Sequence, residues 1–326
     1  MIAIFVQLLP FFFLIGLGYL AIRLAFLPQE AVAYMSRFVF FVPLPAMLFD
    51  FVSSLPVEEI FNLPVALAYG GGSLLVYLVA FVVAKLRGCG RGEAVVESQC
   101  SVIGNVGFLG IPLLVMLFGE PAAAPILLVL AIDLIVFGSL IIIGITSAEK
   151  KGSREDNNIP GKEGTTLNTL KLIIKGLLAN PMIVAILVGL MWSALALPIP
   201  QSLKLTIDIL SPAATPCALL AIGGSLAIRS AERVYIATWL SFLKLVVHPL
   251  VIALFAIALF DIDPFWAAIM VASAAMPVAG NIFLIAQHYN VAPQRVSGSI
   301  LVSTVASLVT LTAAIAWAMN WLGMVG

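Results

Sequence analysis

Charged residues are scarce in this chain: they make up 10% of its 326 residues, whereas 62% are hydrophobic. A soluble globular domain carries about 25% charged and about 45–50% apolar residues, so the composition excludes that class and indicates a membrane protein. Sixteen Lys and Arg balance sixteen Asp and Glu, which leaves no basic excess for nucleic acid and no acidic tail. We therefore expect membrane lipid around the chain and no nucleic-acid partner.

Residues that build catalytic or metal centres are also few. The chain has three cysteines, Cys89, Cys100 and Cys217, without a CxxC pair, and two histidines, His248 and His288. A disulfide framework, an HExxH zinc site or a GxSxG nucleophile cannot be assembled from this set. The sequence thus predicts no metal, no cofactor and no enzymatic activity.

Long apolar runs, in contrast, are abundant. A helix needs about 20 predominantly apolar residues to cross the hydrocarbon core of a bilayer. By that criterion we predict ten spans, at residues 3–23, 32–52, 65–85, 95–118, 122–146, 170–196, 203–228, 235–260, 265–288 and 296–320. The predicted fold class is an all-α multi-pass membrane protein with ten transmembrane helices.

One long polar segment, residues 147–169, predicts a flexible linker between two five-span halves, residues 1–146 and 170–326. Basic residues gather in alternate loops, which are expected to face the cytoplasm. These residues are Arg23, Arg37, Lys85, Arg87, Arg91, Lys150, Lys151, Arg154, Lys162, Lys171, Lys175, Arg229, Arg233 and Arg295. We expect a protein of the cell (inner) membrane with the linker inside and both termini outside.

The two halves share the same order of proline and glycine. Three residues of the first half recur 171 positions later in the second half, and Gly104-Asn105 recurs 176 positions later as Gly280-Asn281. The three pairs are Pro10 with Pro181, Gly18 with Gly189, and Pro45 with Pro216. Because each half has an odd number of spans, the duplication predicts inverted repeats, which are typical of secondary transporters.

The fourth and ninth predicted spans each contain helix-breaking residues. The fourth carries SVIGNVGFLGIP, residues 101–112, and the ninth carries AAMPVAGNIF, residues 274–283. Glycine tolerates unwound backbone and proline removes a donor, so both spans are predicted to be discontinuous. Half-helix N-termini and the amides of Asn105 and Asn281 would then cradle a carboxylate. Close helix packing is the alternative explanation of the small residues.

The string GNVGFLGIP, residues 104–112, resembles the fourth-span motif of the auxin efflux carrier family, which contains the plant PIN carriers and bacterial transporters. The segment FFVPLPAMLF, residues 40–49, is also similar to that family. The resemblance implies two inverted five-helix repeats of the bile-acid-symporter and NhaA type. A scaffold would comprise helices 1, 2, 6 and 7. An elevator-type transport domain would comprise helices 3–5 and 8–10, with helices 4 and 9 crossing at the substrate.

The resemblance also implies a homodimer and assigns the substrate carboxylate to Asn105 and Asn281. The candidate substrate-binding residues are Pro45 in the second span and, in the two breaks, Gly104, Asn105, Gly107, Gly110, Pro112, Pro277, Gly280 and Asn281. The short linker departs from the long loop of the plant carriers.

Ionisable residues inside predicted spans form a second candidate group. Asp133 lies mid-span, and Lys244 and His248 are four residues apart on one helical face. A charge at this depth is costly and is usually paired inside the protein. One interpretation is a proton or cation relay formed by Asp133, Lys244 and His248, with Asp133 as carrier and Lys244 as its counter-ion or competitor. The other is a fixed structural pair. For His248, a satisfied residue at the helix break beside Pro249 is favoured over a proton donor. Glu97, at the start of the fourth span, suits either a vestibule or the membrane interface.

The predicted function is a secondary transporter that carries a small organic anion, a carboxylate of the malonate, malate or auxin type, with H⁺ or Na⁺ as coupling ion. A sodium-coupled symporter of the bile-acid type is one alternative. An intramembrane enzyme and a channel are two more.

Overall fold

The computed structural model describes residues 2–54, 62–145, 178, 180–228 and 234–324. Within these ranges the regular elements are helices joined by short loops, with one isolated antiparallel bridge between Gly104 and Val278. The predicted linker 147–169 lies outside the described residues, as do several of the loop charges used to predict orientation. The all-α prediction is confirmed for the part of the chain that is described.

The helices follow the order of the predicted apolar runs. In the first half they are α1 Ile2–Arg23, α2 Glu30–Phe41, α3 Pro43–Ser54, α5 Leu63–Leu86, α6 Arg91–Val102, the π-helical η1 Val106–Gly110, α7 Ile111–Phe118, the 3₁₀ turn η2 Glu120–Ala122, α8 Ala123–Ala131 and the π-helical η3 Ile132–Phe137. In the second half they are α11 Pro181–Ala194, α12 Gln201–Ile228, α13 Val234–Phe242, the π-helical η4 Leu243–Val247, α14 His248–Ala253, the π-helical η5 Leu254–Leu259, α15 Pro264–Ala274, α16 Asn281–His288 and α17 Pro293–Trp321.

Six helical stretches of the described chain are long and apolar enough to cross a membrane. They are Glu30–Ser54, Leu63–Leu86, Glu120–Ile145, Gln201–Ile228, Val234–Leu259 and Pro293–Trp321. Shorter apolar helices occupy Leu9–Arg23, Val106–Phe118, Pro181–Ala194 and Pro264–Ala274. The multi-pass architecture is therefore established, while the count of ten spans stays a prediction.

Helix starts follow from local sequence. The Asn62 side chain accepts a hydrogen bond from the Val65 N–H at 3.2 Å at the start of α5, and Asn180 accepts from the Met182 N–H at 3.0 Å at the start of α11. Asp263 accepts from two N–H groups in the first turn of α15. In each case a proline follows in the first turn, where its missing donor costs nothing.

Helix α1 has two apolar faces, as expected of a helix between protein and lipid. Leu9, Phe13, Leu17 and Leu20 form an exposed stripe at spacings of three and four residues, and Phe13 is 68% exposed. On the other face, Phe11, Ile15, Gly18 and Ile22 are buried, and α1 packs along α12. A continuous apolar stripe is unfavourable in contact with water, so we assign this face of α1 to the lipid-facing surface.

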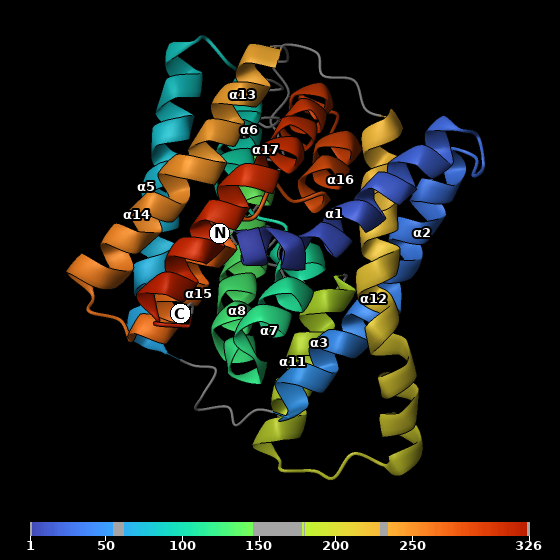
Figure 1. The fold of residues 1–326 in the computed structure, drawn as a ribbon. Helices are drawn as coiled ribbons and strands as arrows, with labels where there is room; N and C mark the ends of the chain where they lie inside the picture. Colours follow the sequence, from blue (N-terminus) through green and yellow to red (C-terminus); the bar gives the residue numbers. More distant parts are fainter. Residues whose placement is uncertain (1, 55–61, 146–177, 179, 229–233, 325–326) are drawn as a thin grey trace, which may run out of the picture.

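The helices form two groups (Figure 1). Helices α1, α2, α3, α11 and α12 pack on one another on the right and lower right of the view, whereas α5, α6, α13, α14, α15 and α17 pack together on the left. In the first group, α1 packs on α12 and α11 packs on α3. The two groups meet around the interrupted segments α6–α7 and α15–α16.

Glycines allow the closest contacts within the first group. A Cβ on Gly18 would lie 2.1 Å from the Leu220 carbonyl oxygen, and a Cβ on Gly189 would lie 3.3 Å from the Phe49 carbonyl oxygen. Gly189 follows Gly18 by 171 positions, and Leu220 follows Phe49 by the same number. The two contacts therefore join equivalent positions of the two halves, with the order of the halves exchanged.

Candidate functional site

The fourth and ninth apolar segments are both interrupted, and the two interruptions are paired. Helix α6 ends at Val102 and α15 ends at Ala274. Between them, the Asn105 N–H donates to the Pro277 carbonyl at 2.7 Å and the Ala279 N–H donates to the Ile103 carbonyl at 3.1 Å. Backbone groups released by each break are thus satisfied by the other break, as buried backbone at this depth requires.

A helical segment restarts directly after each asparagine position. The Asn105 carbonyl accepts hydrogen bonds from the N–H groups of Leu109 and Gly110, both at 3.0 Å, and η1 begins at Val106. On the other side of the pairing, α16 begins at Asn281 itself. The first N–H groups of a helix have no partner within the helix and carry a partial positive charge, so both restarts present donors suited to an anion.

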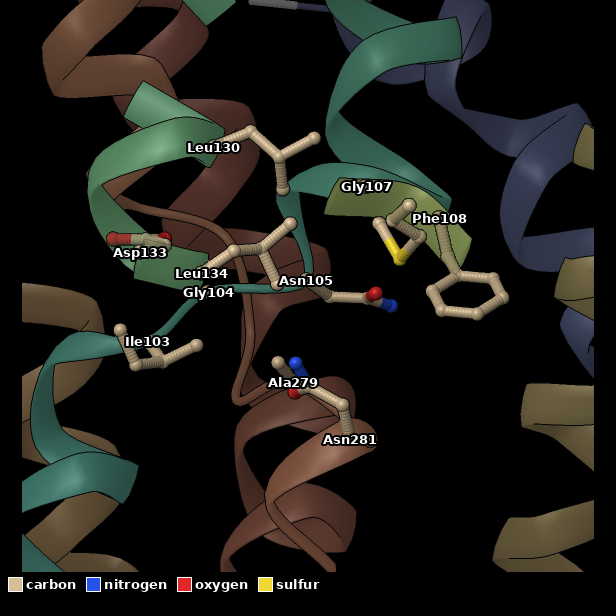
Figure 2. A pocket seen from close by; sticks show the side chains of 12 residues that line it. Ile103, Gly104, Asn105, Gly107, Phe108, Leu130, Asp133, Leu134, Ala279 and Asn281 are labelled. Carbon is tan, nitrogen blue, oxygen red and sulfur yellow. The ribbon is translucent and has the colours of Figure 1, made fainter. Parts of the chain in front are cut away.

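The two asparagines line one large cavity, of about 720 Å³, between the two helix groups. The Asn105 side chain is 7% exposed, and the buried Asn281 Oδ1 has no hydrogen-bond partner. In Figure 2 the Asn105 amide and the Phe108 ring extend to the same side of the Ile103–Asn105 segment, with Asn281 beneath them. A volume of this size lies within the range of about 300–1,000 Å³ typical of small-molecule sites.

The opposite wall of this cavity comes from α2 and α12. Helix α2 contributes Ser36, Arg37 and Phe40, and α12 contributes Ala218 and Ser225 among others. Arg37 alone carries a charge among the described residues of the lining, and its guanidinium lies 5.9 Å from the centroid of the Phe41 ring. The cavity therefore combines an apolar body, a few polar groups and one cation, which suits a small anion.

Asp133 lies beside the breaks but on another side of them. It lines a small pocket of about 20 Å³ together with Ile103, Gly104 and Asn105. Its side chain is 4% exposed, and both carboxylate oxygens are buried without a hydrogen-bond partner. Figure 2 shows Asp133 on the opposite side of the Ile103–Asn105 segment from the Asn105 amide. The pocket has room for about one water molecule, and Asp133 is not among the residues that line the large cavity.

Lys244 and His248 are fully buried and belong to a polar chain behind the breaks. The Lys244 ammonium donates to the Ala274 carbonyl and lies 3.2 Å from His248 Nδ1, and His248 Nε2 lies 2.9 Å from the Ser73 hydroxyl. Lys244 and Asp133 are close enough to interact through their charges, but no ion pair within 4 Å joins these two described residues. The predicted pairing is thus electrostatic proximity without direct contact.

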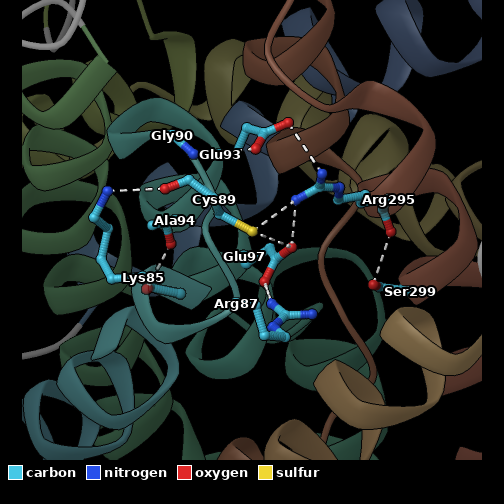
Figure 3. Close-up of polar contacts among 10 residues, drawn as sticks. Lys85, Arg87, Cys89, Gly90, Glu93, Ala94, Glu97, Arg295 and Ser299 are labelled. Carbon is cyan, nitrogen blue, oxygen red and sulfur yellow. Dashed lines mark hydrogen bonds and ion pairs between the residues drawn. The ribbon is translucent and has the colours of Figure 1, made fainter. Parts of the chain in front are cut away.

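Glu97 is buried and is not among the residues that line the large cavity. Its side chain is fully buried and paired with Arg87 and with Arg295, whose Nη1 lies 2.7 Å from Glu97 Oε1. Arg295 also binds Glu93 at 3.0 Å, as Figure 3 shows. A buried carboxylate must be paired with cations. Since one of these cations, Arg295, lies in the first turn of α17, the cluster joins α6 to α17.

The structure brings five of the predicted substrate-binding residues to the two cavities. They are Gly104, Asn105, Gly107, Gly280 and Asn281. The remaining predicted residues line neither cavity: Gly110, Pro112 and Pro277 belong to the interrupted segments, and Pro45 lies in α3.

Sequence reasoning did not assign a role to Arg37, Phe108, Tyr69 or Ser73. Arg37 enters the prediction of orientation only, although a charge inside an apolar helix indicates a functional position. Phe108 stands within the most recognisable motif of the chain, GNVGFLGIP. Tyr69 and Ser73 are neutral residues of an apolar run, and nothing in their sequence context distinguishes them from packing residues.

The sequence of this chain matches a known protein family. The family model described as "Membrane transport protein" matches residues 3–315. A Rhizobium meliloti protein named "Putative malonate transporter" is 32% identical over 310 residues, covering 93% of this chain and 92% of that protein. The Escherichia coli "Uncharacterized transporter YfdV" is 26% identical over 311 residues, covering 93% and 94%.

A protein of Methanothermobacter thermautotrophicus named "Uncharacterized transporter" is 26% identical over 304 residues, covering 91% of this chain and 93% of that protein. The family match spans nearly the whole chain, including both interrupted segments. The resemblance carried by residues 104–112 is thereby confirmed: the chain belongs to the membrane transport protein family that includes the auxin efflux carriers.

Proposed function

We propose that this protein is a secondary transporter of small carboxylates and that the substrate carboxylate binds between Asn105 and Asn281. The observation that carries the proposal is that Asn105 and Asn281 line the same cavity of about 720 Å³, where their side-chain NH₂ groups can donate hydrogen bonds to a carboxylate. An amide at each helix restart, together with the free N–H groups of the first turns, matches the acceptor geometry of a carboxylate. The name of the Rhizobium relative supports malonate as the first substrate to test.

The arrangement of the two helix groups supports an elevator mechanism. The cavity lies between α2 and α12 on one side and the paired breaks with α16 and α17 on the other. We assign the group of α1, α2, α3, α11 and α12 to the scaffold and the group around the breaks to the transport domain. Movement of the second group against the first would carry the bound anion across the membrane while its ligands stay in place.

Reciprocal glycine contacts support the inverted repeat on which this mechanism depends. Gly18 packs on the backbone at Leu220, and Gly189 packs on the backbone at Phe49. A pseudo-twofold axis that exchanges the halves would relate these two contacts, because each residue maps onto its counterpart 171 positions away. The paired breaks at Asn105 and Asn281 would lie on the same axis.

The cavity reaches the ends of helices that are predicted to face the cytoplasm. Gln29, Ile228 and Gln294 line it, and each lies at or beside a predicted cytoplasmic helix end. In the proposed orientation, with both termini outside a bacterial inner membrane, the structure is open to the inside. Arg37 would then draw anions into the vestibule from the cytoplasm.

The homodimer implied by the family resemblance is part of the proposal. The molar mass of the protein in detergent, measured by light scattering with correction for bound detergent, tests it. A monomeric mass would remove the dimer without affecting the proposed substrate site.

Binding measurements on asparagine variants test the site. Purified wild type, Asn105→Ala, Asn281→Ala and the control Asn320→Ala, whose side chain is exposed on α17, are titrated with malonate. A hydrogen bond to a charged group contributes about 1.5–3 kcal/mol, so each site variant should weaken malonate affinity by about tenfold to a hundredfold. The control should bind as wild type does. Undiminished affinity in both site variants would show that the carboxylate binds elsewhere.

Transport measurements test the function. Proteoliposomes should take up radiolabelled malonate with saturation and with competition by unlabelled dicarboxylates. An unsaturable current would indicate a channel, and chemical conversion of malonate would indicate an enzyme. With an imposed pH gradient, Asp133→Asn should remove the dependence of the rate on that gradient if Asp133 carries the coupled proton.

A further inference from the structure

One buried ammonium group touches both interrupted segments. Lys244 is fully buried on the π-helical turn η4, and its Nζ donates to the carbonyl of Ala274, the last residue of α15. The same nitrogen lies against the first break, because a Cβ on Gly104 would stand 3.2 Å from Lys244 Nζ. A side chain at position 104 would also meet the Ser273 carbonyl oxygen at 3.2 Å. The glycine thus leaves room for the ammonium.

The helix ends around this ammonium carry negative partial charge. Helix α6 ends at Val102 and α15 ends at Ala274, so two C-termini converge at the breaks. Each C-terminus is equivalent to roughly half a negative charge, owing to carbonyls that lack partners within the helix. Transporters built on discontinuous helices use such C-terminal ends and unwound carbonyls to coordinate Na⁺. Here a side-chain cation occupies that position.

Polar groups on the neighbouring elements complete the surroundings of Lys244. From α14, His248 Nδ1 lies 3.2 Å from the Lys244 Nζ, and from η3, the buried carboxylate of Asp133 lies within electrostatic range of it. The Ser273 hydroxyl on α15 is buried without a hydrogen-bond partner, and the buried Tyr69 hydroxyl on α5 lies beside Asp133 and Ser73. Carboxylate, hydroxyl and carbonyl oxygens are the ligands that hard cations prefer.

We propose that Lys244 is a built-in cation that replaces the alkali ion of a discontinuous-helix transporter and makes this protein independent of Na⁺. The inference rests on the proposed transport function, because it names the ion that such transport does not need. The sequence leaves H⁺ and Na⁺ both open as coupling ions. A built-in cation at Lys244 excludes Na⁺ and with it the sodium-coupled symporter. Removal of the ammonium should leave an oxygen-lined space that accepts a small cation from solution.

Thermal unfolding of purified protein in detergent tests this without any substrate. Wild type, Lys244→Ala and Lys244→Met are compared in NaCl, KCl, methylammonium chloride and choline chloride at constant ionic strength. The Tm of wild type should be the same in all four salts. The Tm of Lys244→Ala should rise by several degrees in NaCl or methylammonium chloride relative to choline chloride. Lys244→Met should not respond, because its apolar side chain fills the space.

Two results would overturn the proposal. One is a Na⁺-specific rise in the Tm of wild type, which would mean that the protein keeps an alkali-ion site of its own. The other is a Lys244→Ala variant whose Tm is indifferent to all four cations. A further outcome is that Lys244→Ala does not fold in choline chloride. Folded variant obtained after expression and purification with methylammonium or Na⁺ then supports the proposal. Failure to obtain folded variant in any of the four salts contradicts the proposal.

Uptake by the wild-type protein separates this inference from the proposed function. Radiolabelled malonate uptake in proteoliposomes should proceed at an equal rate with Na⁺ or with choline on both sides. A requirement for Na⁺ would refute the built-in cation while leaving the transport function intact. Absence of malonate transport together with the expected salt response of Lys244→Ala would refute the substrate and leave the built-in cation standing.

Discussion

The contact between α1 and α12 offers a sharp test of the fold, through the substitution Gly18→Ala. A Cβ at this position would lie 2.1 Å from the Leu220 carbonyl oxygen and 2.9 Å from its Cα, whereas ordinary contacts of a Cβ lie at 3.4–4 Å. The obstacle is backbone, which cannot rotate away, so α1 must move outwards by about 1 Å. Overpacking of this kind costs about 1–3 kcal/mol, and a rigid neighbour places Gly18→Ala near the upper end.

A gain in helix propensity offsets part of that cost. Alanine is more favourable than glycine in a helix by about 1 kcal/mol, so the expected net loss of stability is about 2 kcal/mol. At roughly 2–4 °C per kcal/mol, Tm in detergent should fall by about 4 °C or more. The measurement is thermal unfolding of the purified variant, followed by intrinsic fluorescence or by loss of the monodisperse size-exclusion peak.

Gly16→Ala is the matched control, since Gly16 lies two residues before Gly18 on the same helix. No atom lies within 4 Å of a Cβ at Gly16, so this substitution should leave Tm unchanged or raise it slightly. Gly223→Ala changes the same interface from the side of α12, where a Cβ would lie 1.8 Å from the Ile15 carbonyl oxygen. It should destabilise the protein at least as strongly as Gly18→Ala. Equal Tm values for Gly18→Ala and Gly16→Ala would refute the close approach of α1 and α12.

Three further predictions concern charged residues. Glu97→Gln leaves Arg87 and Arg295 without their shared carboxylate and should destabilise the protein by about 3 kcal/mol, measured as a lower Tm; an unchanged Tm would contradict the buried ion pair. Arg37→Gln should raise the KM for malonate by about tenfold at low ionic strength and less at high salt, because the attraction is screened; a salt-independent change would contradict steering by Arg37. Asp133→Asn should transport malonate at a rate that no longer varies with an imposed pH gradient; a rate that still follows the gradient would exclude Asp133 as proton carrier.

Much of the architecture followed from the sequence because membrane spans obey a strong local constraint. Lipid offers no hydrogen bonds, so an apolar run of sufficient length must form a helix, and the described part of these runs is helical except at the interruptions in the fourth and ninth. The interruptions in the fourth and ninth segments were predictable for the same reason, since glycine and proline alter the backbone locally. Asn105 and Asn281 stood out because a polar amide beside such a break needs a partner.

Other features depended on which elements meet in space. Arg37 lies far from Asn105 in sequence, and only the placement of α2 and α12 across from the breaks brings both residues to one cavity. Glu97 carried no signal of burial, because its two cations come from a loop and from α17. Asp133 and Lys244 interact through their charges without an ion pair within 4 Å, a separation that only the packing of η3 and η4 sets.

The multi-pass architecture, the resemblance to a transporter family and the positions of the backbone interruptions can be read from the order of the residues. These properties depend on hydropathy and on local φ/ψ preferences, which each segment expresses without the rest of the chain. What meets the interruptions follows from how the helices pack: a cavity with Asn105 and Asn281 lies on one side, and the ammonium of Lys244 lies on the other. Contacts between distant elements, such as Lys244 with Ala274, depend on how helices pack, and no local pattern encodes that.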